Sequence, residues 1–246
     1  MKIISLNTAH ALFYNEFISF VKEKRHETDV FCFQEVTNWI RFFPEWRKNL
    51  LQDISELLDE FNVIINDYAN YEDGCIAIFI HKKWNYNDTY AWIFAEHYVQ
   101  SHDWWFRDVG MYVWLQVIIE EKKLILINVH GLWYPWDKLE NTIRIEQKNN
   151  IVQLLNQFTV PVLLIWDFNL HPDTDTIVQL WKKLNNLNQL FWVYDTRWAW
   201  TQYFGTKDYQ PYADYAFASE SICIKSYSTE EKVISDHKAL LLSITL

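Results

Sequence analysis

The chain has 246 residues, half of them hydrophobic, which excludes a disordered protein and allows a sizeable core. No apolar run approaches the roughly 18 to 20 residues that a membrane-spanning helix needs. The N-terminal segment lacks the features of a signal peptide, so we expect a cytoplasmic protein. The formal net charge of −10 argues against a strong binder of duplex nucleic acid, which is usually held by a basic face.

The first part of the chain alternates strand and helix patterns. We predict strands at 2–7 and 29–36 and helices at 15–25 and 44–61, the latter with Pro44 in its first turn. The run at 29–36 is continuously apolar, as expected of a strand covered on both faces.

The rest of the chain is richer in strand patterns. Helices are predicted at 139–158, where Asp137 and Glu140 have the spacing of a capping box, and at 174–184. The predicted strands are 62–67, 75–81, 89–98, 111–120, 123–131, 160–169, 191–196, 212–219, 222–228 and 238–246.

No internal repeat, low-complexity tract or Pro/Gly/Ser linker interrupts the chain, so we expect a single domain over residues 1–246. The mixture of elements predicts an α/β fold, a four-layer α/β sandwich in which two packed mixed β-sheets are flanked by helices. Three widely spaced cysteines, Cys32, Cys75 and Cys223, are expected to be buried, reduced thiols.

Glycine and tryptophan have unusual frequencies, with 4 Gly and 14 Trp. Average usage of about 7% would give roughly 17 Gly in a chain of this length. Several Trp stand in turn-like sequence, including Trp136, Trp198, Trp200 and a Trp104-Trp105 pair in a polar stretch. We therefore interpret many Trp positions as Gly in the natural protein, as would follow if UGA codons that encode Gly are translated as Trp. The alternative is an aromatic-rich protein whose exposed Trp stack on sugars or bases.

Polar side chains of a similar kind stand at the ends of several predicted strands, and later ones lie within the predicted strand at 212–219 and just before the last strand. Because strand ends aim side chains from distant parts of a chain into one cleft, we expect these residues to share a site. They are Asn7, Glu35, His130, Asp167, Asn169, Asp214, Asp236 and His237. Carboxylate and carboxamide oxygens are typical ligands of Mg²⁺ or Mn²⁺, and the chain has no Cys/His cluster with structural zinc spacing. This set indicates metal-assisted hydrolysis of a phosphoester.

The ordered motifs "SLN", "FCFQEV", "NVHGLW", "WDFN", "ADYAFAS" and "SDH" resemble those of the endonuclease/exonuclease/phosphatase superfamily. The stretch "INVHGLW" is most similar to an uncharacterised bacterial branch. The resemblance spans Asn7 to His237 and implies a four-layer sandwich with metal-dependent phosphoesterase activity. It further implies that Glu35 is the principal Mg²⁺ ligand, with Asn7 beside it and Asp236 contributing to the metal site.

The same resemblance implies a phosphate site. Asp167 would orient and activate the attacking water, and Asn169 would hold a phosphate oxygen. His237 would contact or protonate the phosphoryl group, Asp214 would fix the tautomer of His237, and His130 would also face the phosphate.

The chain departs from the family pattern at Trp166, where the motif before Asp167 has Gly, so the activity of the chain as written is in question. Ala9 and His130 replace an acidic residue and a Tyr of apurinic-site nucleases, which weakens a DNA-repair assignment. Arg107 and Arg197 are weaker candidates for phosphate contacts. The stretch 96–108, which contains two His, is expected to be a mobile loop near the substrate, with a metal site as the alternative.

The leading hypothesis is a metal-dependent phosphoesterase, a nuclease or a small-molecule phosphodiesterase or phosphatase, that acts by direct attack of water. It would use Mg²⁺ or Mn²⁺ on a phosphorylated substrate, as a monomer without a membrane span. Two alternatives remain: a catalytically weak binding or scaffold member of the same fold, and an aromatic-rich carbohydrate or nucleobase binder.

Overall fold

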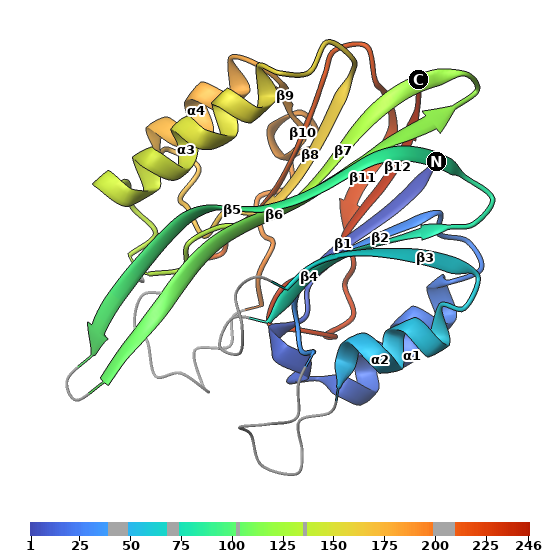
Figure 1. Cartoon of the computed structure of the whole chain (residues 1–246), viewed down its shortest axis with the longest axis horizontal. Coiled ribbons are helices and arrows are strands. Elements are labelled where there is room, and N and C mark those ends of the chain that lie inside the picture. Colours follow the sequence, from blue (N-terminus) through green and yellow to red (C-terminus); the bar gives the residue numbers. More distant parts are fainter. Residues whose placement is uncertain (39–48, 68–73, 102–103, 135–136, 199–209) are drawn as a thin grey trace.

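The computed structural model describes residues 1–38, 49–67, 74–101, 104–134, 137–198 and 210–246, with the side chains of residues 100–107 excepted. Two six-stranded mixed sheets form the centre of the molecule (Figure 1). In spatial order the first sheet contains β11 (Cys223–Thr229), β12 (Leu240–Thr245), β1 (Lys2–Asn7), β2 (Val30–Val36), β4 (Cys75–His81) and β3 (Phe61–Asn66). The second contains β5 (Asn85–Ser101), β6 (Trp104–Ile119), β7 (Lys122–His130), β8 (Val162–Asp167), β10 (Asp214–Ala218) and β9 (Asn185–Asn186).

Helices cover the outer faces of the sheets. The first sheet carries α1 (Tyr14–Lys24) and α2 (Leu50–Leu57), and the second carries α3 (Thr142–Leu155) and α4 (Asp175–Trp181) (Figure 1). A short 3₁₀ turn (Ala9–Ala11) follows β1, and the one-turn helix α5 (Leu187–Leu190) follows β9. None of these helices is long and apolar enough to cross a membrane.

Three apolar layers result from the alternation of side chains along the strands. Leu163 and Ile165 of β8 point into the layer between the two sheets, whereas Leu164 and Trp166 point toward α3 and α4. A third layer lies between the first sheet and α1 and α2, where Phe31 and similar side chains are buried. The predicted four-layer α/β sandwich is therefore confirmed.

Helix boundaries differ from the sequence prediction where a local cap decides them. The side chain of Asn141 accepts a hydrogen bond from the backbone N–H of Arg144, so α3 begins at Thr142 and the proposed capping box at Asp137 and Glu140 is wrong. Glu140 instead accepts hydrogen bonds from the hydroxyl and the backbone N–H of Thr176. Helix α2 ends at Leu57 and a turn at 58–60 leads into β3, so the predicted helix, which ran to residue 61, is too long at this end. The predicted position of Pro44 in its first turn lies outside the described residues.

The predicted strand at 191–196 is wrong, because α5 ends there in a hydrogen-bonded reversal. The backbone N–H of Val193 donates to Asn188 O (2.9 Å) and that of Trp192 donates to Gln189 O (3.4 Å). This is the Schellman pattern, in which the residue after the cap adopts a left-handed conformation and is usually Gly. Trp192 occupies that position, with φ of 61°.

Two further expectations are corrected. The stretch 96–108 is not a loop, because it pairs as the ends of the β5–β6 hairpin, with His97 opposite Asp108; residues 102–103 and the side chain of Arg107 lie outside the described part. Cys32 and Cys75 are buried, whereas Cys223 is exposed on the edge strand β11.

Candidate active site

Three neighbouring strands of the second sheet bring predicted site residues together. In the parallel pair β7–β8, His130 lies opposite Asp167, and in the antiparallel pair β8–β10, Asp167 lies opposite Asp214. The first sheet contributes Asn7 at the end of β1 and Glu35 near the end of β2. The site therefore forms where the ends of the two sheets meet, and neither sheet supplies all of it.

The backbone at Glu35 is turned out of the regular strand. The pairing of β2 with β4 is irregular between Phe33 and Val36, and Glu35 has φ of 53°. Irregular pairing of this kind re-aims a side chain, and a left-handed conformation costs an L-residue about 1–2 kcal/mol. The hydroxyl of Thr8 donates to Glu35 O (2.8 Å) and helps to hold this conformation. Strained backbone of this kind is concentrated at functional sites, so the Glu35 carboxylate is a candidate for a functional role.

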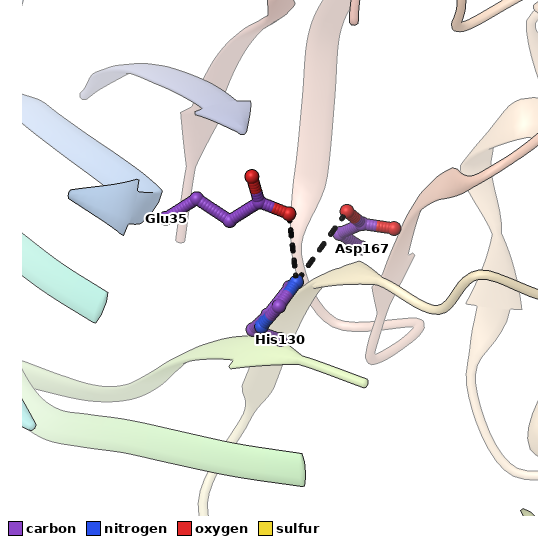
Figure 2. Close-up of side chains that lie close together, drawn as sticks. All are labelled: Glu35, His130 and Asp167. Atoms are coloured by element: carbon purple, nitrogen blue, oxygen red, sulfur yellow. Dashed lines mark ion pairs between the residues drawn. The ribbon is translucent and has the colours of Figure 1, made fainter. Parts of the chain in front are cut away.

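Glu35, His130 and Asp167 form the first cluster of the site (Figure 2). His130 Nε2 lies 3.4 Å from Glu35 Oε1 and 4.0 Å from Asp167 Oδ2. The second Glu35 oxygen lies 3.2 Å from His10 Nε2. Burial would raise the pKa of Glu35, but the charges of the two histidines and a hydrogen bond from Asn7 more than offset it, so the pKa lies well below its ordinary value. Glu35 is therefore anionic at neutral pH.

Asn7 connects the two carboxylates. Its Nδ2 donates to Glu35 Oε1 (2.9 Å) and to Asp167 Oδ2 (2.7 Å), while its Oδ1 accepts from the backbone N–H of Ala9 (2.9 Å). In this arrangement the amide nitrogen, and not the oxygen, faces the carboxylates. Asn7 thus lies at the predicted metal site, where it is hydrogen-bonded to the carboxylates of both Glu35 and Asp167.

Asp167, Asp214 and His237 form the second cluster, so Asp167 belongs to both. His237 Nδ1 lies 2.9 Å from Asp214 Oδ2, and its Nε2 lies 3.9 Å from Asp167 Oδ2. Burial would lower the pKa of His237, but the carboxylates of the surrounding aspartates raise it to about 9. Burial raises the pKa of Asp214, with His237 opposing the rise. The predicted orientation of His237 by Asp214 matches this geometry.

Asp236 lies outside both clusters. Its Oδ2 accepts a hydrogen bond from Arg197 Nη2 (2.9 Å), and its Oδ1 lies 3.9 Å from His237 Nε2. The preceding Ser235 hydroxyl donates to Asn7 O (2.6 Å) and so ties this segment to the end of β1. The structure thus places Asp236 at the border of the site and pairs it with Arg197, one of the weaker candidates for a phosphate contact.

Asn169 contacts a residue that the sequence did not single out. Lys138 Nζ donates to Asn169 Oδ1 (3.1 Å), and the backbone N–H of Asn169 donates to Asp167 Oδ1 (3.2 Å). Lys138 is buried, and this burial lowers its pKa to about 7.

Neither Lys138 nor His10 was predicted from the sequence as a site residue. Lys138 follows a turn-like stretch and lies 31 positions before Asn169, and His10 lies in the turn after β1, so no local pattern marked either residue.

The donor set of the first cluster fits a divalent cation. Two carboxylates, from Glu35 and Asp167, approach one imidazole, and Asn7 holds both carboxylates in place. Carboxylate oxygens suit both Mg²⁺ and Mn²⁺. Glu35, Asp167 and His130 are therefore the residues that would hold such an ion.

Trp166 does not enter this site, although it precedes Asp167. Its ring is fully buried in the layer under α3 and α4, stacked on Phe168 with ring centroids 3.5 Å apart. A Cβ atom on Gly131 would come within 2.9 Å of Trp166 Nε1, so this tight contact needs Gly at position 131. The Trp166 indole N–H is buried without a hydrogen-bond partner among the described residues. The misfit of Trp166 therefore concerns the packing of the core, on the face of β8 that points away from the Asp167 side chain.

Comparison with known proteins agrees with this geometry. Residues 5–237 match the Endonuclease/Exonuclease/phosphatase family, and the chain belongs to that family. No curated protein matches the sequence.

Solved structures share the fold at low sequence identity. An endonuclease/exonuclease/phosphatase from Bacteroides vulgatus superposes with a TM-score of 0.74 at 17% identity, over 100% of this chain and 98% of the other. The mannosyl-6-phosphatase of Bacteroides thetaiotaomicron gives 0.71 at 14% identity, with both chains fully covered. TDP2 of D. rerio, in complex with a single-stranded DNA product, gives 0.70 at 15% identity, over 100% of this chain and 99% of the other.

Proposed function

We propose that the protein is a phosphoesterase that requires Mg²⁺, with Mn²⁺ as a substitute, and hydrolyses a phosphodiester or a phosphomonoester by direct attack of water. The observation that carries this proposal is the position of Asp167, which is buried and shared by the acidic cluster around Glu35 and the Asp214–His237 pair. The proposal is further supported by membership of a family that includes phosphoesterases.

When bound, the cation supplies positive charge that offsets the charge developing on the phosphoryl oxygens. Glu35, Asp167 and His130 would hold it. Asp167 also orients the attacking water and takes its proton as the water oxygen bonds to phosphorus. Asn169 binds a phosphoryl oxygen. His237, kept protonated by Asp214, donates to the phosphoryl group or gives its proton to the leaving oxygen as the ester bond breaks.

The test is hydrolysis of bis(p-nitrophenyl) phosphate and p-nitrophenyl phosphate with Mg²⁺, with Mn²⁺ and with EDTA. We expect metal-dependent turnover that falls by about 10²–10⁴-fold in Asp167→Asn, the range for loss of a proton-transfer group. Asp29→Asn is the matched control, because Asp29 is also buried but bonds to Lys83 and Trp84 away from the site.

Turnover that persists in EDTA, or is unchanged in a folded Asp167→Asn protein, would contradict the proposal. A folded parent protein that binds metal but turns over neither ester would favour the scaffold alternative instead.

A further inference from the structure

Lys138 differs from the other buried lysines in the described part of the chain. Lys148 pairs with Asp175 at 3.0 Å, and Lys238 pairs with Asp195 at 3.2 Å and with Glu231 at 3.5 Å. Lys138, which is 5% exposed, has no carboxylate within ion-pair distance among the described residues. Its side-chain nitrogen contacts only the neutral amide oxygen of Asn169 there.

An ammonium group has three donors, and burial of its charge is costly unless an anion or several acceptors compensate. Asn169 Oδ1 uses one donor of Lys138 and leaves the others available. The carboxylates of Asp167, Asp214 and Asp236 act on Lys138 through space, without an ion pair among the described residues. Since Asn169 belongs to the predicted phosphate site, a phosphoryl group bound there is an anion that Lys138 could contact directly. Because its oxygen accepts from Lys138, the amide group of Asn169 has its nitrogen at the opposite end, available to donate to a phosphoryl oxygen.

The backbone supports a dedicated role for this contact. Lys138 has φ of 54° and Asn169 has φ of 52°, so both partners occupy the left-handed region that L-residues rarely adopt. The two segments are joined a second time, because the backbone N–H of His171 donates to Lys138 O (2.9 Å). The segment that contains Lys138 is also held by the buried Arg144, which donates to Leu139 O (2.7 Å).

We propose that Lys138 is a further residue of the phosphate site, whose ammonium orients Asn169 and binds a non-bridging oxygen of the phosphoryl group. This inference rests on the proposed function. The competing explanation is that Lys138 only balances the charge of Asp167, Asp214 and Asp236 through space, without touching the substrate.

The two explanations differ in phosphate binding. With saturating Mg²⁺, the affinity for inorganic phosphate is measured by calorimetry, and its inhibition constant in the p-nitrophenyl ester assay. We expect Lys138→Met, which keeps length and removes charge, to weaken phosphate binding by about 10–100-fold, as for loss of a hydrogen bond to a charged group. The matched control Lys148→Met removes an equally buried lysine on α3 and should leave phosphate affinity essentially unchanged.

A double-mutant cycle with Asn169→Ala separates the two roles of Lys138. If the ammonium touches phosphate itself, Lys138→Met weakens binding further in the Asn169→Ala background; an effect that disappears there would leave Lys138 as a positioning residue only and overturn the direct contact. Unchanged phosphate affinity in folded Lys138→Met, alongside a parent that turns over, would overturn this inference alone. A parent that neither binds phosphate nor turns over would overturn the proposed function with it.

Discussion

The two clusters that share Asp167 differ in how far they are closed. In the first, the Glu35 side chain is 20% exposed and is surrounded by His10, His130 and Asn7. In the second, the Asp214 and His237 side chains are 7% and 5% exposed and bond mainly to each other. The Glu35 carboxylate is thus reachable from solvent, whereas the Asp214 carboxylate is buried in its pair with His237.

Under the proposed function, we expect this difference to give chemically similar residues separate tasks. A reachable carboxylate with several donors around it suits an exchangeable cation, whereas a sealed Asp–His pair suits a fixed protonation state. Asp167 takes part in both because β8 is the central strand of three, with His130 of β7 opposite Asp167 on one side and Asp214, the first residue of β10, opposite it on the other. Substitutions in the first cluster should therefore alter metal affinity, whereas substitutions in the second should alter the pKa of His237.

Among changes confined to one of the two clusters, the largest effect is expected from Glu35→Gln, which keeps the shape and removes the charge that would hold the cation. Loss of several kcal/mol of charge stabilisation corresponds to about 10²–10³-fold in kcat/KM. The apparent affinity for Mn²⁺, measured by calorimetry, should fall as well, and high Mn²⁺ should restore part of the activity. Full activity without a change in metal affinity would remove Glu35 from the metal site. Glu60→Gln, in the turn before β3, serves as the surface control.

A smaller effect, about 10–100-fold in kcat, is expected from Asp214→Asn, because partners that orient a functional group typically contribute that much. Metal affinity should change little. The pKa of His237, followed by NMR, should fall from about 9, since a carboxylate that raises it is gone.

The same change should alter the pH dependence of stability. A raised histidine pKa contributes stability that is complete below the unfolded value of 6.5 and is lost as pH rises through about 9. The parent protein should show this loss, and Asp214→Asn should show less of it. An unchanged His237 pKa would contradict the pairing.

The smallest effect concerns the Trp that stand in glycine-like positions. Trp192 is 77% exposed and left-handed at the end of α5, so Trp192→Gly should raise the free energy of unfolding by about 1 kcal/mol. Trp92→Gly, on the exposed face of β5, should instead lower it, since Gly is unfavourable in strands. A loss in both variants would argue that Trp192 is an authentic Trp. A UGG codon at position 192 would reject the translation hypothesis there directly.

Strand-end polarity was the most informative pattern in the sequence. The motifs that end at Asn7, His130 and Asp167 combine an apolar run with a terminal polar residue, and the structure places all three in one site. They lie together because each sheet contains a parallel pair, β1–β2 and β7–β8, whose carboxyl ends lie side by side, and because these ends of the two sheets meet. Local helix ends were predicted less well, since Asn141 and not Asp137 caps α3.

The sequence by itself determined the α/β class, the main strands and the residue types of a phosphoesterase site, because periodicity and strand-end chemistry are local properties of the chain. Only the tertiary structure decided which acid is shared, that Asn7 turns its nitrogen toward the carboxylates, and that Lys138 meets Asn169. These contacts join segments far apart in the chain through left-handed turns at Glu35, Lys138 and Asn169. Such backbone conformations are stabilised by the surrounding contacts and not by the intrinsic preference of the residue, so no local sequence pattern predicts them.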